Sequence, residues 1–274
     1  MNNKQRTKKK YGQHFLIDDN IADQIVDYAG ISPDNTVLEI GPGKGILTER
    51  LLERTGNVTA VEIDRNLIKY LKKKFLGSKG LNLVEADILK TDLNQLFEDV
   101  RGKIKVVSNL PYYISTPIVE LLCKNTKLIS DAVLMIQKEV ASRLIAVPGS
   151  KEFGLTTLNL GLYAKGRAVM DIKPDAFNPP PAVMSSVILL VFSDKMLYPL
   201  ESEVMFRTLT GIAFRQRRKM MRNTVVPYLV SLGISNDEIT DILNASGIDT
   251  SARPETINVA DFVNLSNAVV KAIT

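Results

Sequence analysis

Short apolar runs alternate with segments of helical spacing through the first half of this chain, and no other feature restricts the fold as strongly. Each run has the length of a buried strand and is followed by polar residues or glycine. The predicted strands are 37–40, 58–63, 81–86, 104–107 and 132–136. Because strands that alternate with helices form parallel βαβ units, we predict an α/β fold: a Rossmann-like, doubly wound sheet with helices on both faces.

Beyond residue 147 the alternation weakens, and two further strands are predicted at 169–172 and 187–192. From about residue 201 every segment is predicted to be helical. One of these helices should begin at Ser235, which has Glu238 three residues later in a capping-box pattern. We therefore predict two domains. They are 1–195, which includes a basic arm at 1–10, and a small all-helical C-terminal domain at 196–274.

Composition limits the chemistry of this 274-residue chain, in which 45% of the residues are hydrophobic. The single cysteine, Cys123, excludes an intrachain disulfide and suits a reducing cytoplasm. The single histidine, His14, leaves no Cys/His cluster for a structural metal. No apolar stretch approaches ~18 residues, and the basic N-terminus does not resemble a secretory signal. We expect a cytoplasmic protein with neither a membrane partner nor a structural metal.

Positive charge is concentrated in two places, although the net charge is only +5. Residues 4–10 and 215–222 each hold five cationic side chains. A charge run by itself is more often a solvated face. Two such runs in a basic chain favour a polyanionic partner, because phosphates neutralised by lysine or arginine release counterions.

A glycine-rich turn follows the first predicted strand, in the pattern E-x-G-x-G-x-G from Glu39 to Gly45. Glycine permits positive φ and a close approach of backbone to ligand. The turn is not a phosphate-binding P-loop, which requires G-x-x-x-x-G-K-[ST]. It is not a dinucleotide-binding G-x-G-x-x-G either, because Ile46 occupies the sixth position counted from Gly41. It resembles the S-adenosylmethionine (SAM) loop of Rossmann-like methyltransferases.

Acidic residues mark the ends of the next two predicted strands: Glu62 lies at the end of the second, and Asp87 follows the third. A single acid at a strand end is more often a helix cap or a solvated loop residue. In open α/β sheets, however, ligands bind at the carboxyl ends of the strands, where an acid accepts hydrogen bonds from ribose hydroxyls. Gly, Glu and Asp at three successive strand ends favour a nucleoside cofactor such as SAM.

The fourth predicted strand is followed by Asn109, Leu110, Pro111 and Tyr112. The Asn109 side-chain oxygen and the Leu110 carbonyl can accept both hydrogens of an adenine amine, while Tyr112 offers a face for base stacking. Phe177 is a candidate for the opposite face of the base, and a core position is an equally weighted alternative. A base in a helix cannot reach such a site, so the target must be unpaired or flipped out. These residues suggest methyl transfer to an adenine amine.

Several of these segments resemble the ribosomal RNA adenine dimethyltransferases. They are 11–16, the glycine turn and 109–117. The segments 214–223 and 247–259 are similar to the housekeeping small-subunit enzymes of the kasugamycin-sensitivity type in that family. The resemblance extends over almost the whole chain, from about residue 9 to about residue 268.

The resemblance implies that two methyl groups are placed on each of two adjacent adenosines near the 3′ end of small-subunit ribosomal RNA (rRNA), in immature 30S-type particles. We expect the protein to be a monomer. The cofactor-binding residues it implies are His14, Leu16, Gly41, Gly43, Glu62, Asp87 and Asn109. The implied phosphate contacts are Arg215, Arg217, Arg218, Lys219 and Arg222. Departures from the family pattern are His14 and Tyr113, where asparagine is common, and Ala182 and Met184 after the prolines.

Two alternatives remain at this point. A DNA adenine methyltransferase uses a similar clamp, but its sequence usually has two prolines where this chain has Leu110 and one proline. A non-catalytic assembly checkpoint that binds immature small subunits would share the basic surface. Competition by duplex DNA tests the first alternative, and a methylation-dead variant that still supports subunit maturation would favour the second.

Overall fold

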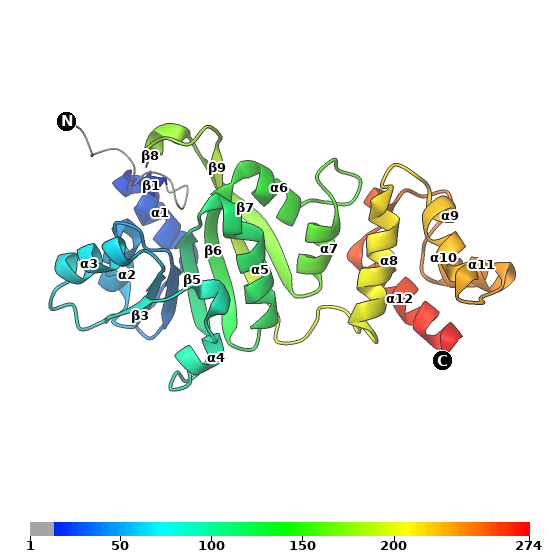
Figure 1. Cartoon of the computed structure of the whole chain (residues 1–274), viewed down its shortest axis with the longest axis horizontal. Helices are drawn as coiled ribbons and strands as arrows, with labels where there is room; N and C mark the ends of the chain where they lie inside the picture. Colours follow the sequence, from blue (N-terminus) through cyan, green and yellow to red (C-terminus); the bar gives the residue numbers. More distant parts are fainter. Residues whose placement is uncertain (1–13) are drawn as a thin grey trace, which may run out of the picture. The chain divides into compact units, whose positions relative to one another are not determined.

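A computed structural model describes residues 14–274 of the chain (Figure 1). Residues 11–13 of the first family-like segment and the basic arm at 1–10 lie outside the described residues. The chain divides into two compact units, the second of which comprises Ser142–Ala164 and Lys195–Thr274. The first comprises the described residues up to Ala141 together with Lys165–Asp194.

A seven-stranded sheet forms the first unit, in the order β4-β3-β2-β5-β6-β9-β7. The strands are β2 (Val37–Ile40), β3 (Val58–Glu62), β4 (Leu81–Glu85), β5 (Ile104–Asn109), β6 (Ile129–Gln137), β7 (Ala164–Ile172) and β9 (Ser185–Phe192). Strands β2 to β6 pair in parallel, which confirms the predicted α/β fold. Strand β9 pairs antiparallel with β6, an orientation that the sequence did not predict.

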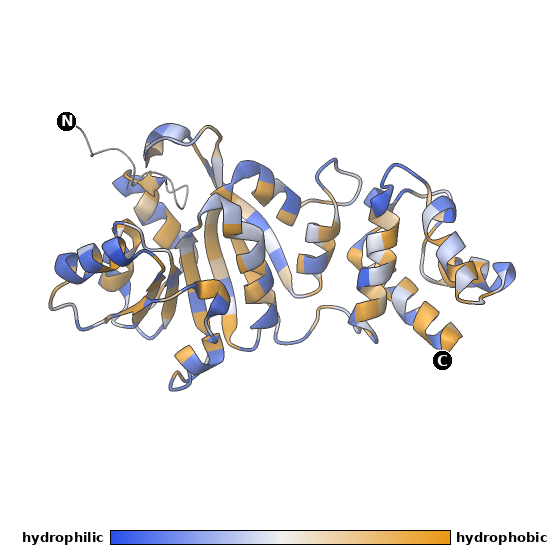
Figure 2. Ribbon diagram, viewed as in Figure 1, coloured by the Kyte–Doolittle hydropathy of each residue, from blue (hydrophilic) through white to orange (hydrophobic). Residues whose placement is uncertain are grey.

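Both faces of the sheet are covered at β2 and β3, because every residue of these two strands is buried. Figure 2 shows the central strands as predominantly hydrophobic. The helices of this region are α1 (Asp19–Ala29), α2 (Ile46–Arg54), α3 (Arg65–Lys74), α4 (Leu93–Leu96), α5 (Ser115–Lys124) and α6 (Lys138–Leu144). The Asp18 carboxylate accepts a hydrogen bond from the Ile21 amide and so caps α1.

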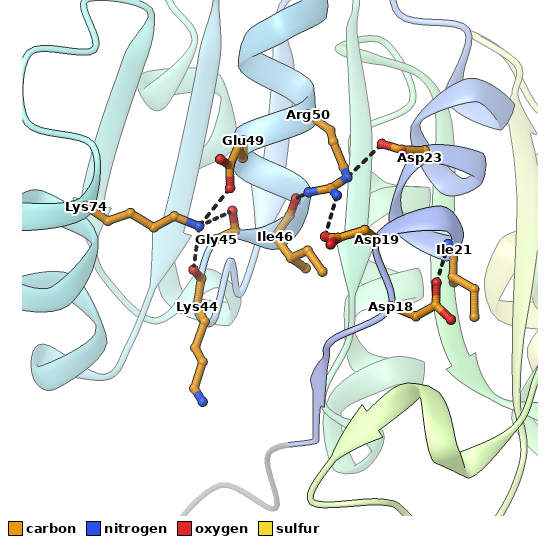
Figure 3. A network of polar contacts seen from close by, with 10 residues as sticks. All are labelled: Asp18, Asp19, Ile21, Asp23, Lys44, Gly45, Ile46, Glu49, Arg50 and Lys74. Atoms are coloured by element: carbon orange, nitrogen blue, oxygen red, sulfur yellow. Dashed lines mark hydrogen bonds and ion pairs between the residues drawn. The ribbon is translucent and has the colours of Figure 1, made fainter.

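Arg50 of α2 fixes this helix to α1, because its guanidinium contacts the carboxylates of Asp19 and Asp23 (Figure 3). A short antiparallel pair, β1 (Phe15–Leu16) with β8 (Phe177–Asn178), sets Leu16 opposite Phe177. The ion pairs thus hold α2, the helix that follows the glycine turn, against α1, and the strand pair holds β1 against residues 177–178.

The second unit is helical and has its own buried core. Its helices are α7 (Leu155–Gly161), α8 (Glu203–Arg215), α9 (Met221–Thr224), α10 (Val226–Ser231), α11 (Asn236–Ala245) and α12 (Val259–Ile273). Ser235 caps α11 as its sequence predicts, with its hydroxyl accepting from the Glu238 amide. We expected one division near residue 195. The helical unit resumes at Lys195, but Phe153 and Leu158 of the earlier segment also lie in its core.

No helix among residues 14–274 combines the length and the apolar character that crossing a membrane requires.

Candidate active site

A cavity of about 330 Å³ lies at the carboxyl ends of four adjacent parallel strands. Residues that follow β2, β3, β4 and β5 all contribute to its wall, together with His14, Phe15 and Leu16. The cavity therefore brings together the glycine turn, the two acidic strand ends and the 109–112 segment, which are far apart in the sequence. All the predicted cofactor-binding residues line it: His14, Leu16, Gly41, Gly43, Glu62, Asp87 and Asn109.

The glycine turn has a backbone conformation that residues with a side chain rarely adopt. Gly41, Gly43 and Gly45 have φ of 66°, 58° and 79°, in the region that favours glycine. A Cβ on Gly45 would lie 2.6 Å from the Phe75 ring, and one on Gly43 would lie 3.0 Å from the Phe15 ring. The turn therefore needs glycine at these two positions both for its conformation and for its packing.

Glu62 ends β3 beneath the glycine turn and is only 4% exposed. Its two carboxylate oxygens accept hydrogen bonds from the amides of Gly43 (3.4 Å) and Asp64 (2.9 Å). Burial raises its pKa above the ordinary value. Asp87 also lines the cavity, and one of its oxygens caps the following turn by accepting from the Leu89 amide (3.1 Å). Both acids thus order local backbone as well as facing the cavity.

Glu39 is a cavity residue that the sequence argument did not assign to the site, although it is the first residue of the E-x-G-x-G-x-G pattern. Its carboxyl group is buried and accepts a hydrogen bond from the Thr48 hydroxyl at 2.6 Å. Burial raises the pKa of Glu39 to about 8, so the group is largely protonated near neutral pH. Together with Glu39, the side chains of Glu62, Asp87 and Asn109 place oxygen atoms at the cavity wall, which suits a ligand rich in hydrogen-bond donors.

Asn109 and Leu110 leave β5 at the cavity wall. The Asn109 amide nitrogen donates to the His14 carbonyl (3.3 Å), so its side-chain oxygen is the group left to accept. The Leu110 amide donates to the Met135 carbonyl of β6 (3.0 Å), and its side chain is buried. Two strands therefore fix the backbone that carries the proposed acceptors.

Tyr112 is half-buried, and its hydroxyl lies 2.8 Å from the Ser185 hydroxyl of β9. The His14 imidazole stacks on its ring, with a centroid separation of 5.6 Å and an interplanar angle of 26°. The His14 Nδ1 lies 2.7 Å from the Pro179 carbonyl oxygen. A planar heteroaromatic ring thus already rests on Tyr112, and His14 lies beside the residue assigned to the base as well as in the cofactor cavity.

Phe177, the other predicted clamp residue, does not line this cavity. Its side chain is 3% exposed and packs in the core of the first unit, opposite Leu16 in the β1–β8 pair. Phe177 therefore occupies the core position that is the alternative to a base contact. Its contact with a base stays a prediction.

The five predicted phosphate contacts lie in and after the end of α8. Arg215, Arg218, Lys219 and Arg222 are exposed. Arg217 differs, because its guanidinium pairs with the Glu255 carboxylate (2.7 Å) and donates to the Lys151 carbonyl (2.8 Å). In this structure Arg217 joins the end of α8 to the segments that contain Glu255 and Lys151. Among residues 14–274, no group of three or more His, Cys, Asp or Glu side chains is placed to hold a metal ion.

Comparisons with known proteins agree with this geometry. Residues 4–271 match the family described as ribosomal RNA adenine dimethylase. The chain is 38% identical to ribosomal RNA small subunit methyltransferase A of Pseudomonas syringae pv. syringae, over 98% of this chain and 96% of the relative. Identity to the protein of that name from Alkaliphilus metalliredigens is 39%, over 96% and 92%.

Solved structures give the same result. A dimethyladenosine transferase from Plasmodium falciparum is 29% identical and superposes with a TM-score of 0.76, over 92% of this chain and 96% of that one. The 23S rRNA methyltransferase ErmE has the same fold, with a TM-score of 0.72 at 24% identity over 93% and 99% of the two chains.

Proposed function

Since this chain belongs to the ribosomal RNA adenine dimethylase family, we propose that it methylates the N6 amines of adenosines in small-subunit rRNA, with SAM as the methyl donor. The observation that carries the proposal is the single cavity at the ends of β2 to β5, where the glycine turn meets the 109–112 segment. One side of this cavity has the features of a nucleoside cofactor site, and the other has hydrogen-bond acceptors and an aromatic face.

The residues of the cavity fit SAM. Its sulfonium is a cation, and its ribose and amines offer the donors that the oxygen-lined wall can accept. We assign the ribose hydroxyls to Glu62 and the adenine amine of the cofactor to Asp87, with the turn at Gly41 and Gly43 admitting the ligand close to backbone. When bound, SAM supplies an electrophilic methyl group.

The acceptors on β5 address the low nucleophilicity of the target amine. The lone pair of adenine N6 is delocalised into the ring, so the amine is a poor nucleophile. Hydrogen bonds from its two hydrogens to the Asn109 side-chain oxygen and the Leu110 carbonyl favour a localised lone pair. Tyr112 holds the base by stacking, worth roughly 1–3 kcal/mol. Fixed placement of the amine lowers the barrier further, and such placement contributes up to about 7–11 kcal/mol in well-oriented reactions.

The substrate must present an accessible adenosine. We propose that this adenosine lies in the hairpin near the 3′ end of small-subunit rRNA and that two adjacent adenosines react in turn. A paired base would first have to flip out, at a cost of a few kcal/mol. The immature small subunit is the proposed substrate particle, and the protein acts on it as a monomer.

The direct test is methylation of small subunits purified from cells that lack this modification. The protein and SAM should produce dimethyladenosine, detected by mass spectrometry of the digested rRNA. Duplex DNA added in excess should neither be methylated nor compete. Absence of dimethyladenosine on the rRNA, or preferential methylation of the DNA, would contradict the proposal.

A further inference from the structure

Helix α3 and the turn after it carry a cluster of positive charge that the function above does not use. Residues 65–84 contain six cationic side chains and no acidic one. The cations are Arg65, Lys69, Lys72, Lys73, Lys74 and Lys79. The basic run at 215–222 is denser, with five cations in eight residues, but the α3 cluster lies in the unit that holds the cavity.

Only part of this charge is compensated within the protein. Arg65 pairs with Glu85, and Lys74 pairs with Glu49. Lys69, Lys72 and Lys73 are exposed, and no ion pair joins them to any residue in the described part of the chain. Spacings of three and four residues place these three lysines on one face of the helix. The opposite face is buried through Ile68 and Leu71.

The end of α3 packs directly on the cavity wall. The Lys74 ammonium lies 3.4 Å from the carbonyl oxygens of Lys44 and Gly45 (Figure 3). Phe75 and Leu71 fill the space beside Gly45, within 3.0 Å of where a Cβ would lie. Lys44 itself lines the cavity. The carboxyl end of α3, which carries the lysine face, therefore lies next to the glycine turn.

We propose that the exposed face of α3 is an RNA-binding surface, on which Lys69, Lys72 and Lys73 contact phosphates of the rRNA outside the target nucleotide. The inference rests on the proposed function, which supplies a polyanionic substrate. Uncompensated lysines on a rigid helix attract phosphates without reading sequence. Tyr70, 49% exposed on the same helix, adds a surface on which an unpaired base can stack.

The test compares two triple variants. K69Q/K72Q/K73Q removes the three charges from α3. R101Q/K124Q/K127Q is the matched control: it removes three exposed charges from the same unit, next to the amino ends of β5 and β6 and hence at the sheet edge opposite the cavity. Binding to small subunits that lack the modification is measured between 50 and 200 mM salt, and the KM for SAM is measured in parallel.

The α3 variant should bind more weakly at low salt, with a salt slope that is less negative by about 2 to 3. Its loss of affinity between 50 and 200 mM salt should be roughly 20- to 40-fold smaller than that of the wild type. The α3 variant should keep the wild-type KM for SAM. The control variant should keep both the wild-type salt slope and the wild-type KM. If the wild type methylates the particles and the α3 variant keeps the wild-type slope, the RNA surface is refuted and the proposed function stands. A wild type that produces no dimethyladenosine refutes the proposed function instead.

Discussion

The hydroxyl oxygen of Tyr112 lies 2.8 Å from the hydroxyl oxygen of Ser185, so one hydrogen bond joins the ring assigned to the target base to strand β9. Ser185 is fully buried and is the first residue of that strand, where it pairs with Gln137 of β6. Tyr112 comes directly after the turn that ends β5. The position of the Tyr112 ring is therefore set by β5, a parallel strand of the sheet, and by β9, which runs antiparallel to its neighbour β6.

Loss of the Ser185 hydroxyl should lower turnover by releasing this ring. We expect Ser185→Ala to reduce kcat roughly 10- to 100-fold, the range that small misplacements cause, with little change in the KM for SAM. Ser185→Thr, which keeps a hydroxyl, should restore part of the rate. Ser186→Ala is the matched control, since that neighbouring buried hydroxyl contacts Asp171 (2.8 Å) instead.

A double-mutant cycle separates positioning from general destabilisation. Tyr112→Phe breaks the same hydrogen bond from the other side, so adding Ser185→Ala to it should cost little more. Fully additive losses, or an equal loss of kcat in Ser186→Ala, would contradict the positioning role.

Asn109→Ala should impair chemistry far more than binding. The side-chain oxygen of Asn109 is one of two proposed acceptors for the target amine, and loss of a comparable stabilising group typically costs about 100- to 1,000-fold in kcat. RNA affinity should change by less than roughly threefold, because most of it comes from phosphate contacts. Single-turnover rates and binding curves measure the two effects. Equal losses in rate and in RNA affinity would contradict the role of Asn109 as an acceptor for the target amine.

Local patterns predicted the scaffold and the place of the cavity. The apolar runs predicted β2 to β6, and the capping box at Ser235 and the glycine turn predicted features that depend only on nearby residues. Because parallel strands end at one edge of the sheet, residues from four strand ends had to converge.

Contacts between distant segments were beyond sequence reasoning. Phe177 has the same neighbours in the sequence whether its ring faces a base or the core, and only the fold shows that it pairs with Leu16 and packs in the core. Arg217 lies in a run of five cations, but only the fold brings Glu255 to it. The partner of Tyr112, Ser185, comes from an antiparallel strand whose orientation no local pattern gives.

Arg217 and Arg218 should therefore respond differently to the same change. Arg217→Gln removes the Glu255 pair and the bond to the Lys151 carbonyl, so it should lower the stability of the helical unit by roughly 1 kcal/mol. Arg218→Gln should leave the unfolding midpoint unchanged and make the salt slope of RNA binding less negative by about 0.7 to 0.9. Thermal unfolding and salt titrations test both. Identical behaviour of the two variants would contradict the assignment of Arg217 to structure.

The buried carboxyl of Glu39 should make stability fall as pH rises. Its pKa is about 8 in the folded protein, against an ordinary value of 4.5, so between these values the folded state binds the proton more strongly than the unfolded state. The free energy of unfolding then decreases with pH across this window, by at most about 1.4 kcal/mol per pH unit for one carboxyl. Below pH 4.5 both states are protonated, and the contribution no longer changes.

Glu39→Gln tests this dependence, because the amide cannot ionise and can still accept from the Thr48 hydroxyl, as the carboxyl does at 2.6 Å. Urea midpoints measured from pH 5 to pH 8 should decline less steeply in the variant, which should be at least as stable as the wild type at pH 8. Burial also raises the pKa of Glu62, so part of the decline should remain. Glu120→Gln, an exposed change on α5, should keep the wild-type slope. If Glu39→Gln also keeps the wild-type slope of stability against pH, the Glu39 carboxyl is not the group that titrates.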